Sequence, residues 1–153
     1  MFEDICKFYK NFMNEDFAPF ELAVKLKEKG YNEPCFGWYY PSEVCGFDYK
    51  TTIVFNSCAY RGCNYKDMLV SHKDEKHVDA PTIPQVLKWL REEKKMHIIV
   101  EISDSGWYYT IYPNVRWENG KLKSDKYIMS FKHKASYEQA ALAGIEYTLD
   151  NLI

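Results

Sequence analysis

Two tight-turn signals in the second half of the chain constrain its fold more than any other feature. In HIIVEI, residues 97–102, a strand would place Ile98, Val100 and Ile102 on one face and His97, Ile99 and Glu101 on the other. SDSG at 103–106 predicts a turn into a second strand within 107–117, and ENGK at 118–121 predicts a type I′ turn because Asn-Gly accepts positive φ angles. With the returning segment KYIMSFK at 126–132, the pattern predicts a three-stranded antiparallel meander.

Apolar spacing and capping residues predict four helices around these strands. The first runs from Phe2 to about Met13, and the second, PFELAVKLKEK, stops at Gly30. The other two begin at capping boxes, T-x-x-Q from Thr82 and S-x-x-Q from Ser136. We therefore expect an α+β fold, a two-layer sandwich in which helices cover one face of an antiparallel sheet.

Length and the absence of a linker favour one domain over residues 1–153. Residues 42–79 form an irregular excursion that we expect to lie over the open face of the sheet. The formal net charge of -2 gives no global argument for nucleic acid or for an anionic membrane. No signal peptide or membrane-spanning run is present, so a cytoplasmic protein without membrane contact is expected.

Five cysteines in such a compartment indicate reduced thiols, and Cys6, Cys35 and Cys45 are most simply small apolar groups. The other two open the run C-x4-C-x8-H-x4-H. Its pair spacings suit zinc, but the eight residues between the pairs are fewer than the twelve of a C2H2 finger. We therefore expect a loop and no cofactor, with a small zinc-binding module as an alternative whose ligands would be Cys58, Cys63, His72 and His77.

Aromatic residues make up 17% of the chain and are concentrated on the predicted strands. Helices cover only one face of a two-layer sheet, so rings on the other face need the excursion, a partner or a ligand to cover them. Because Tyr and Trp anchor many interfaces, we expect protein contact, with self-association the first choice and a small-ligand groove the alternative. The candidate residues are Trp38, Tyr40, Trp107 and Tyr109.

A basic stretch at 116–134 offers a different function. Six basic residues stand there against two acidic ones, close to aromatic side chains, a combination that single-stranded nucleic acid favours. A charge-rich hairpin is more often a solvated surface, so nucleic-acid binding is the alternative to protein contact. The candidates for nucleic-acid contact are Arg116, Lys121, Lys123 and Lys126.

Motifs of catalysis are missing from the sequence. It contains no G-x-S-x-G, no phosphate-binding glycine loop and no H-E-x-x-H. We expect a protein that is not an enzyme and assign no catalytic residue, although a missing motif alone leaves an enzyme as a further alternative.

Four segments together resemble a known group of proteins: ELAVKLKEKGYNEPCFGWYY, APTIPQVLKWLREEK with HIIVEI, GWYYTIY, and SYEQAALAGIEYTLDNLI. They are similar to small uncharacterised proteins encoded in prophages and other mobile elements of gut anaerobic bacteria. The resemblance covers about half of the chain and excludes residues 42–79. It implies an accessory protein of a phage or integrated element, and it implies no activity or catalytic residue.

Overall fold

The computed structural model describes residues 16–39, 53–55 and 77–153. The chain divides into two compact units, Met1–Thr82 and Ile83–Ile153, here called the N-terminal and C-terminal units. Helices and antiparallel sheets occur together, which confirms the predicted α+β class. The predicted helix over 2–13 and most of the excursion over 42–79 lie outside the described residues. The expectation of a single domain stays a prediction.

The N-terminal unit contains one helix and a small sheet. Helix α2 spans Phe20–Glu28, directly after Pro19, and ends before Gly30, whose φ of 87° is the left-handed stop that the sequence predicted. Three short antiparallel strands, in the order β2-β1-β3, form its sheet. They are β1 (Gly37–Tyr39), β2 (Val54–Phe55) and β3 (Val78–Asp79).

Tyr39 in β1 connects the sheet of this unit to the start of α2 and the residues before it. Its hydroxyl donates a hydrogen bond to the carbonyl oxygen of Ala18 at 2.8 Å, and its ring meets Phe20 edge-on with centroids 5.7 Å apart. Burial raises the pKa of Tyr39 to about 12, so the phenol stays a neutral donor at neutral pH. The surrounding core consists of Phe17, Ala23, Val78 and Ala80, with Phe20, Val24 and Ile53 packed against it.

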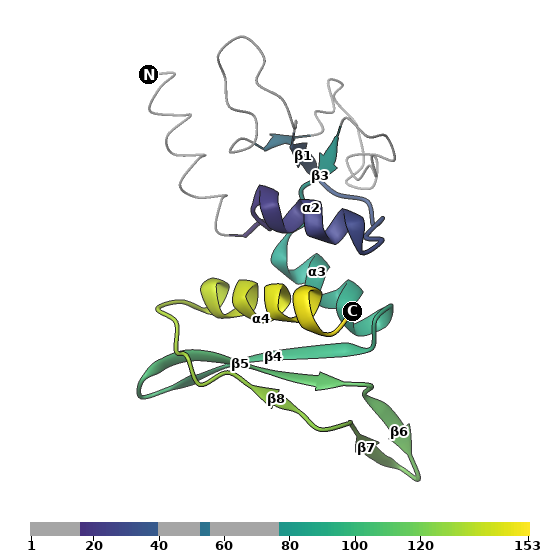
Figure 1. The fold of residues 1–153 in the computed structure, drawn as a ribbon, viewed down its shortest axis with the longest axis vertical. Helices are drawn as coiled ribbons and strands as arrows, with labels where there is room; N and C mark the ends of the chain where they lie inside the picture. The colour runs from purple at the N-terminus through teal and green to yellow at the C-terminus, as the bar shows by residue number, and fades with distance from the viewer. Residues whose placement is uncertain (1–15, 40–52, 56–76) are drawn as a thin grey trace, which may run out of the picture. The chain divides into compact units, whose positions relative to one another are not determined.

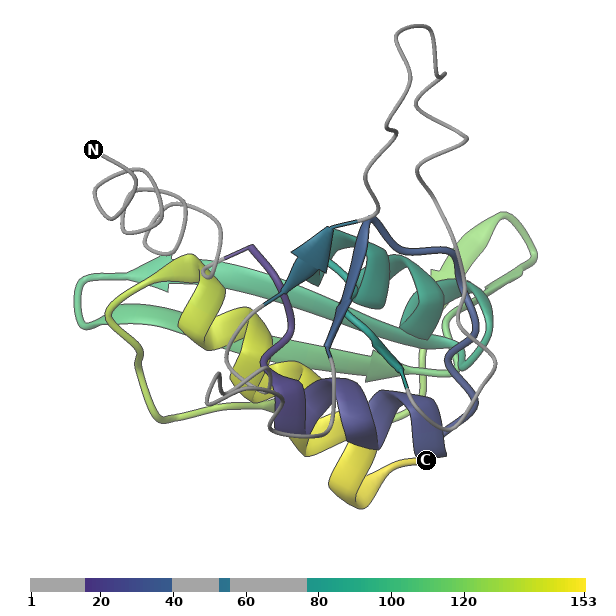
Figure 2. The same cartoon turned by 90° about the horizontal axis from the view of Figure 1, so that it is seen from above.

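The C-terminal unit contains the predicted meander, which one helix precedes and another follows along the chain (Figure 1). Its strands pair in the order β4-β5-β8, while the ENGK turn closes a separate two-stranded sheet, β6-β7. This hairpin projects from the end of the sheet opposite the β4–β5 turn (Figures 1 and 2). The elements are α3 (Ile83–Glu92), β4 (Met96–Ser103), β5 (Gly106–Pro113), β6 (Arg116–Glu118), β7 (Lys121–Lys123), β8 (Ile128–Met129) and α4 (Tyr137–Asn151).

Both predicted turns form where the sequence places them. Asp104 and Ser105 link β4 to β5, and Asn119 and Gly120 adopt φ angles of 51° and 72°. Gly106 has a φ of 120°, and a Cβ there would lie 2.8 Å from the carbonyl oxygen of Lys134. Glycine is therefore required at this position by backbone conformation and by close approach alike.

Both helices of the C-terminal unit lie on the same side of the β4-β5-β8 sheet (Figure 1). Helix α4 starts at Ser136, whose Oγ accepts a hydrogen bond from the backbone N–H of Gln139 at 3.2 Å, as the predicted cap requires. Gly144 allows close packing on the sheet, since a Cβ there would lie 3.0 Å from Ile98 and 3.1 Å from Tyr109. Ile98 and Tyr109 therefore mark the covered face.

Candidate contact face and pocket

The side of the β4-β5-β8 sheet that α3 and α4 do not cover is the candidate functional surface. Side chains alternate along a strand, so the residues between those under α4 point the other way. The register pairs them across the strands as His97↔Tyr112, Ile99↔Thr110, Glu101↔Tyr108 and Thr110↔Met129. We call this surface the open face. Its residues are His97, Ile99, Glu101, Tyr108, Thr110, Tyr112, Tyr127 and Met129.

The open face exposes large apolar side chains. Ile99 is 37% exposed, Met129 38% and Tyr127 55%, and the Tyr127 ring lies 5.8 Å from that of Tyr112. Thr110, between Ile99 and Met129, is fully buried, and among the described residues its Oγ1 has no hydrogen-bond partner. The centre of this face is therefore apolar, with the Thr110 hydroxyl buried beneath its neighbours.

A bulge extends the open face beyond β8. The backbone N–H of Ser130 donates to the carbonyl oxygen of Tyr109, whereas that of Lys134 donates to Trp107, so residues 131–133 stand opposite Tyr108 alone. Extra residues in one strand re-aim their side chains. Phe131, in this bulge, is 86% exposed.

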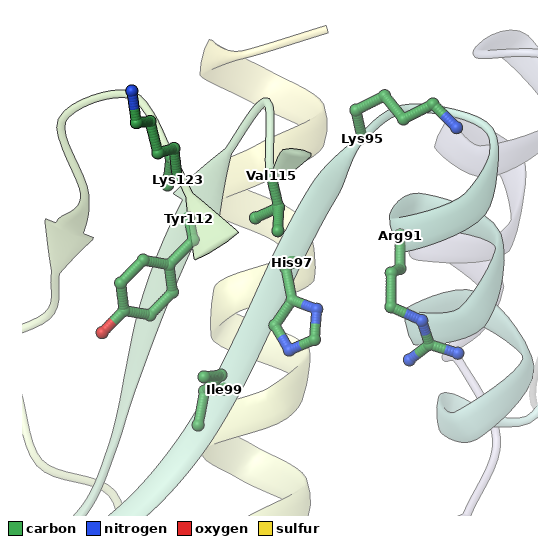
Figure 3. A pocket seen from close by; sticks show the side chains of 8 residues that line it. Arg91, Lys95, His97, Ile99, Tyr112, Val115 and Lys123 are labelled. Atoms are coloured by element: carbon green, nitrogen blue, oxygen red, sulfur yellow. The ribbon is translucent and has the colours of Figure 1, made fainter. Parts of the chain in front are cut away.

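A pocket of about 520 Å³ lies within the C-terminal unit, at the end of the sheet where β4 begins and β5 ends, away from the bulge. Figure 3 shows His97, Ile99 and Tyr112 projecting from the sheet on the side away from α4, with the Arg91 guanidinium beside the His97 ring. Lys95 and Lys123 also line the pocket, and Figure 3 shows their ammonium ends directed away from His97 and Ile99. The full lining is Arg91, Lys95, His97, Ile99, Tyr112, Val115, Lys123 and Ser124.

The pocket is positively charged and contains no carboxylate among its lining residues. Burial, and then the charge of Arg91, lowers the pKa of His97, so its imidazole is neutral at pH 7. A neutral imidazole supplies one donor and one acceptor. The arrangement suits an anion with an apolar portion and supplies no pair of groups for acid–base chemistry.

The four predicted contact residues do not form one surface. Tyr109 is buried under α4, its ring 6.5 Å from that of Tyr147, so it belongs to the core and not to an interface. Trp107 shares this face of β5 and meets the ring of Tyr137 at 5.8 Å. Trp38 lies in the N-terminal unit, and Tyr40 lies outside the described residues.

The basic hairpin is largely neutralised by its own acids. Arg116 lies 2.6 Å from Glu118 and 3.2 Å from Asp125, and Lys123 lies 2.8 Å from Glu118. The hydrogen bond from Lys123, and then that from Arg116, lowers the pKa of Glu118, so the carboxylate stays charged. Of the four predicted nucleic-acid residues, only Lys123 lines the pocket, while Lys121 and Lys126 are exposed elsewhere.

Of the Cys/His run, only His77 lies within the described residues. Cys58, Cys63 and His72 lie outside the described residues, and the His77 ring meets that of Trp38 edge-on at 4.5 Å. Over 16–39, 53–55 and 77–153, no group of three or more His, Cys, Asp or Glu side chains is arranged to hold a metal ion. Cys35 is buried, as predicted, while Cys6 and Cys45 fall in the segments left undescribed.

Three comparisons with known proteins found no match. No protein-family model matches the chain, and neither the curated proteins nor the solved structures provide a match. In the described part of the chain, no helix is long and apolar enough to cross a membrane.

Sequence reasoning missed the residues that the structure brings forward. Arg91, Lys95 and His97 come from α3, the turn after it and β4, and no sequence motif links them. The alternation of β5 separated its two faces correctly but did not say which of them the helices cover. The one sequence feature that indicates the covered face is Gly144, because a glycine in this helix allows α4 to approach Tyr109 closely.

Proposed function

We propose that the protein acts by protein–protein contact and self-associates through the open face. One observation carries the proposal: Ile99, Tyr127, Met129 and Phe131 are large, apolar and exposed, and the first three lie on one side of a single sheet. Apolar groups gathered in this way are typical of an interaction site, whereas scattered ones need no explanation. A contact here would remove them from water.

Charge at the edges of this surface favours a second copy of the chain as the partner. Glu101 in β4 and Lys132 in the bulge lie on either side of Tyr108, and within the described residues neither forms a salt bridge. A twofold axis parallel to β5 and lying between two facing copies would set Glu101 of each copy opposite Lys132 of the other. Such a surface is self-complementary, as a twofold interface requires.

Native mass spectrometry and light scattering of the full chain test the proposal. The wild type should be a dimer, and a protein with Met129→Ser and Phe131→Ser should be a monomer. Ile102→Ser is the matched control, because Ile102 is 66% exposed but belongs to the other face of β4. The control should stay dimeric, and a monomeric wild type would contradict self-association.

A charge exchange tests the orientation separately. Glu101→Lys should weaken the dimer about tenfold, since it places two cations opposite each other. Adding Lys132→Glu to the same chain should restore the dimer. If both the single and the double variant dimerise like wild type, Glu101 and Lys132 do not face each other.

The biological setting of this contact is part of the same proposal. The resemblance to proteins of prophages and mobile elements supports an accessory role in the cytoplasm, carried out by contact and not by catalysis.

A further inference from the structure

The pocket lined by Arg91, Lys95 and Lys123 suits a small anionic ligand, whereas the open face suits a protein partner. We propose that the pocket binds a nucleotide, with the phosphate held by Arg91 in a hollow to which Lys95 and Lys123 add positive charge, and the base against Ile99 and Tyr112. The nucleotide is either free or part of a single strand. This pocket shares His97, Ile99 and Tyr112 with the open face, whereas self-association is tested at Met129 and Phe131, which do not line the pocket.

The number and origin of the cations favour a phosphate. Arg91 comes from the last turn of α3, Lys95 from the turn that follows and Lys123 from the end of β7, so three distant segments bring positive charge to one hollow. Like charges repel one another, and the carboxylates that pair with Arg91 and Lys123, those of Glu92 and Glu118, do not line the pocket. A phosphate monoester, which carries nearly two negative charges at neutral pH, relieves this repulsion better than a single carboxylate does.

The present partners of these cations are weak enough for a ligand to displace. Arg91 lies 3.7 Å from Glu92, and Lys123 lies 2.8 Å from Glu118, with the side chains of both pairs 40% to 51% exposed. Surface pairs of this kind contribute roughly 0–1 kcal/mol. Lys95 donates to the carbonyl oxygen of Glu92 at 2.6 Å, which leaves further N–H donors of its ammonium for a ligand.

The remaining lining favours a flat ring over an inorganic ion. Ile99, Tyr112 and Val115 supply apolar surface next to the cations, and a hollow of about 520 Å³ exceeds what one phosphate needs. Aromatic side chains such as Tyr112 stack on bases without regard to sequence. His97 and the hydroxyl of Ser124 add hydrogen-bonding groups that a base or sugar can use.

Calorimetric titration of the full chain with adenosine 5′-monophosphate, adenosine and inorganic phosphate tests the proposal. The monophosphate should bind at least about tenfold more tightly than either of its parts, because only it meets the cations and the apolar wall together. Absence of measurable binding of the monophosphate, or equal binding of adenosine, would overturn the proposal.

Variants locate the site. Arg91→Gln should weaken monophosphate binding about tenfold, and Lys123→Gln, which removes a more distant charge, should weaken it less. Lys88→Gln, an equal loss of charge on α3 outside the pocket, should leave binding unchanged. Arg91, Lys123 and Lys88 are about half exposed or more, so all three variants should fold, which thermal unfolding verifies. Equal affinity of all three variants would also overturn the proposal.

A short single-stranded oligonucleotide distinguishes the two sources of the ligand. Tighter binding of the strand than of the monophosphate, lost in Arg91→Gln, identifies a nucleotide within nucleic acid. Binding of the monophosphate alone identifies a free nucleotide. Self-association is measured in parallel with the variants of Met129 and Phe131, so either proposal can fail while the other stands.

Discussion

The backbone N–H of Asn114 donates a hydrogen bond to the carbonyl oxygen of Lys95 at 2.8 Å, and both residues have positive φ angles, 52° and 59°. The bond joins the residue before β4 to the residue after β5, just beyond the pair Met96↔Pro113. The side chain of Asn114 also donates to Asp125 at 2.6 Å. These contacts fix the end of the sheet from which the pocket is built.

Lys95 adopts a backbone conformation that suits glycine and asparagine better than lysine. We expect Lys95→Gly to leave the free energy of unfolding unchanged or to raise it by up to about 1 kcal/mol, because relief of the left-handed conformation offsets the entropy of glycine. Lys95→Val should lower it by about 1–2 kcal/mol, since a β-branched residue resists positive φ. Urea denaturation of both variants checks this, and equal losses would contradict the conformational explanation.

Gly144 sets the distance between α4 and the sheet. Gly144→Val should lower the free energy of unfolding by about 2 kcal/mol or more, because its Cβ would meet Ile98 and Tyr109 at 3.0–3.1 Å in a packed core. Ala143→Val, on the preceding residue, loses helix propensity, whereas Gly144→Val gains it, and yet Ala143→Val should cost less. Denaturation of the two variants makes the comparison, and a smaller loss for Gly144→Val would contradict the packing explanation.

Local chemistry made much of the C-terminal unit predictable. Tight turns and helix caps depend only on neighbouring residues, so they can be predicted from sequence. This holds for the turns at Asp104–Ser105 and Asn119–Gly120 and for the cap at Ser136. The length of β8 was not predictable, because the bulge at 131–133 depends on how that segment meets Tyr108. Tyr109 was misplaced for a similar reason, since alternation separates two faces without identifying the covered one.

The candidate site was less predictable than the fold. Arg91, Lys95 and Lys123 look like ordinary surface cations in the sequence, and only the tertiary structure brings them to one hollow. Arg116 shows the opposite case: the sequence made it a candidate for nucleic-acid contact, and the structure pairs it with Glu118 and Asp125. A charge run shows how many charges are present and not which of them neutralise each other.

Thr110 buries a hydroxyl for which the described residues supply no hydrogen-bond partner. Thr110→Val keeps the shape and removes the unpaired group, so the free energy of unfolding should rise by about 1 kcal/mol. Thr148→Val is the matched control, because Thr148 is also buried but donates to the carbonyl oxygen of Gly144 at 2.8 Å. The control should lose about 1 kcal/mol. Denaturation midpoints that shift in the same direction for both variants would contradict this account.

Cys35 should be inert in the folded protein. It is fully buried, and burial raises the pKa of its thiol to about 12, so almost no reactive thiolate is present near pH 8. Alkylation followed by peptide mapping should find Cys35 unmodified in the native state and fully modified in denaturant. Asp104→Cys, in the exposed β4–β5 turn, should react at once under both conditions. Rapid native labelling of Cys35 would show that the N-terminal unit opens readily.

His97 should make stability depend on pH. Burial and the nearby Arg91 lower its pKa in the folded state, whereas the unfolded chain has the ordinary value of about 6.5. As pH falls below about 6.5, the unfolded state therefore takes up a proton before the folded state does, and the free energy of unfolding decreases. The charged groups that line the same pocket, Arg91, Lys95 and Lys123, are all cationic, so none of them compensates an imidazolium.

Urea denaturation of wild type and His97→Gln, at pH values on either side of about 6.5, measures this effect. The wild type should lose stability at the lower pH, and His97→Gln should lose distinctly less because it cannot take up that proton. The same slope in wild type and His97→Gln would show that the imidazole is equally easy to protonate in both states.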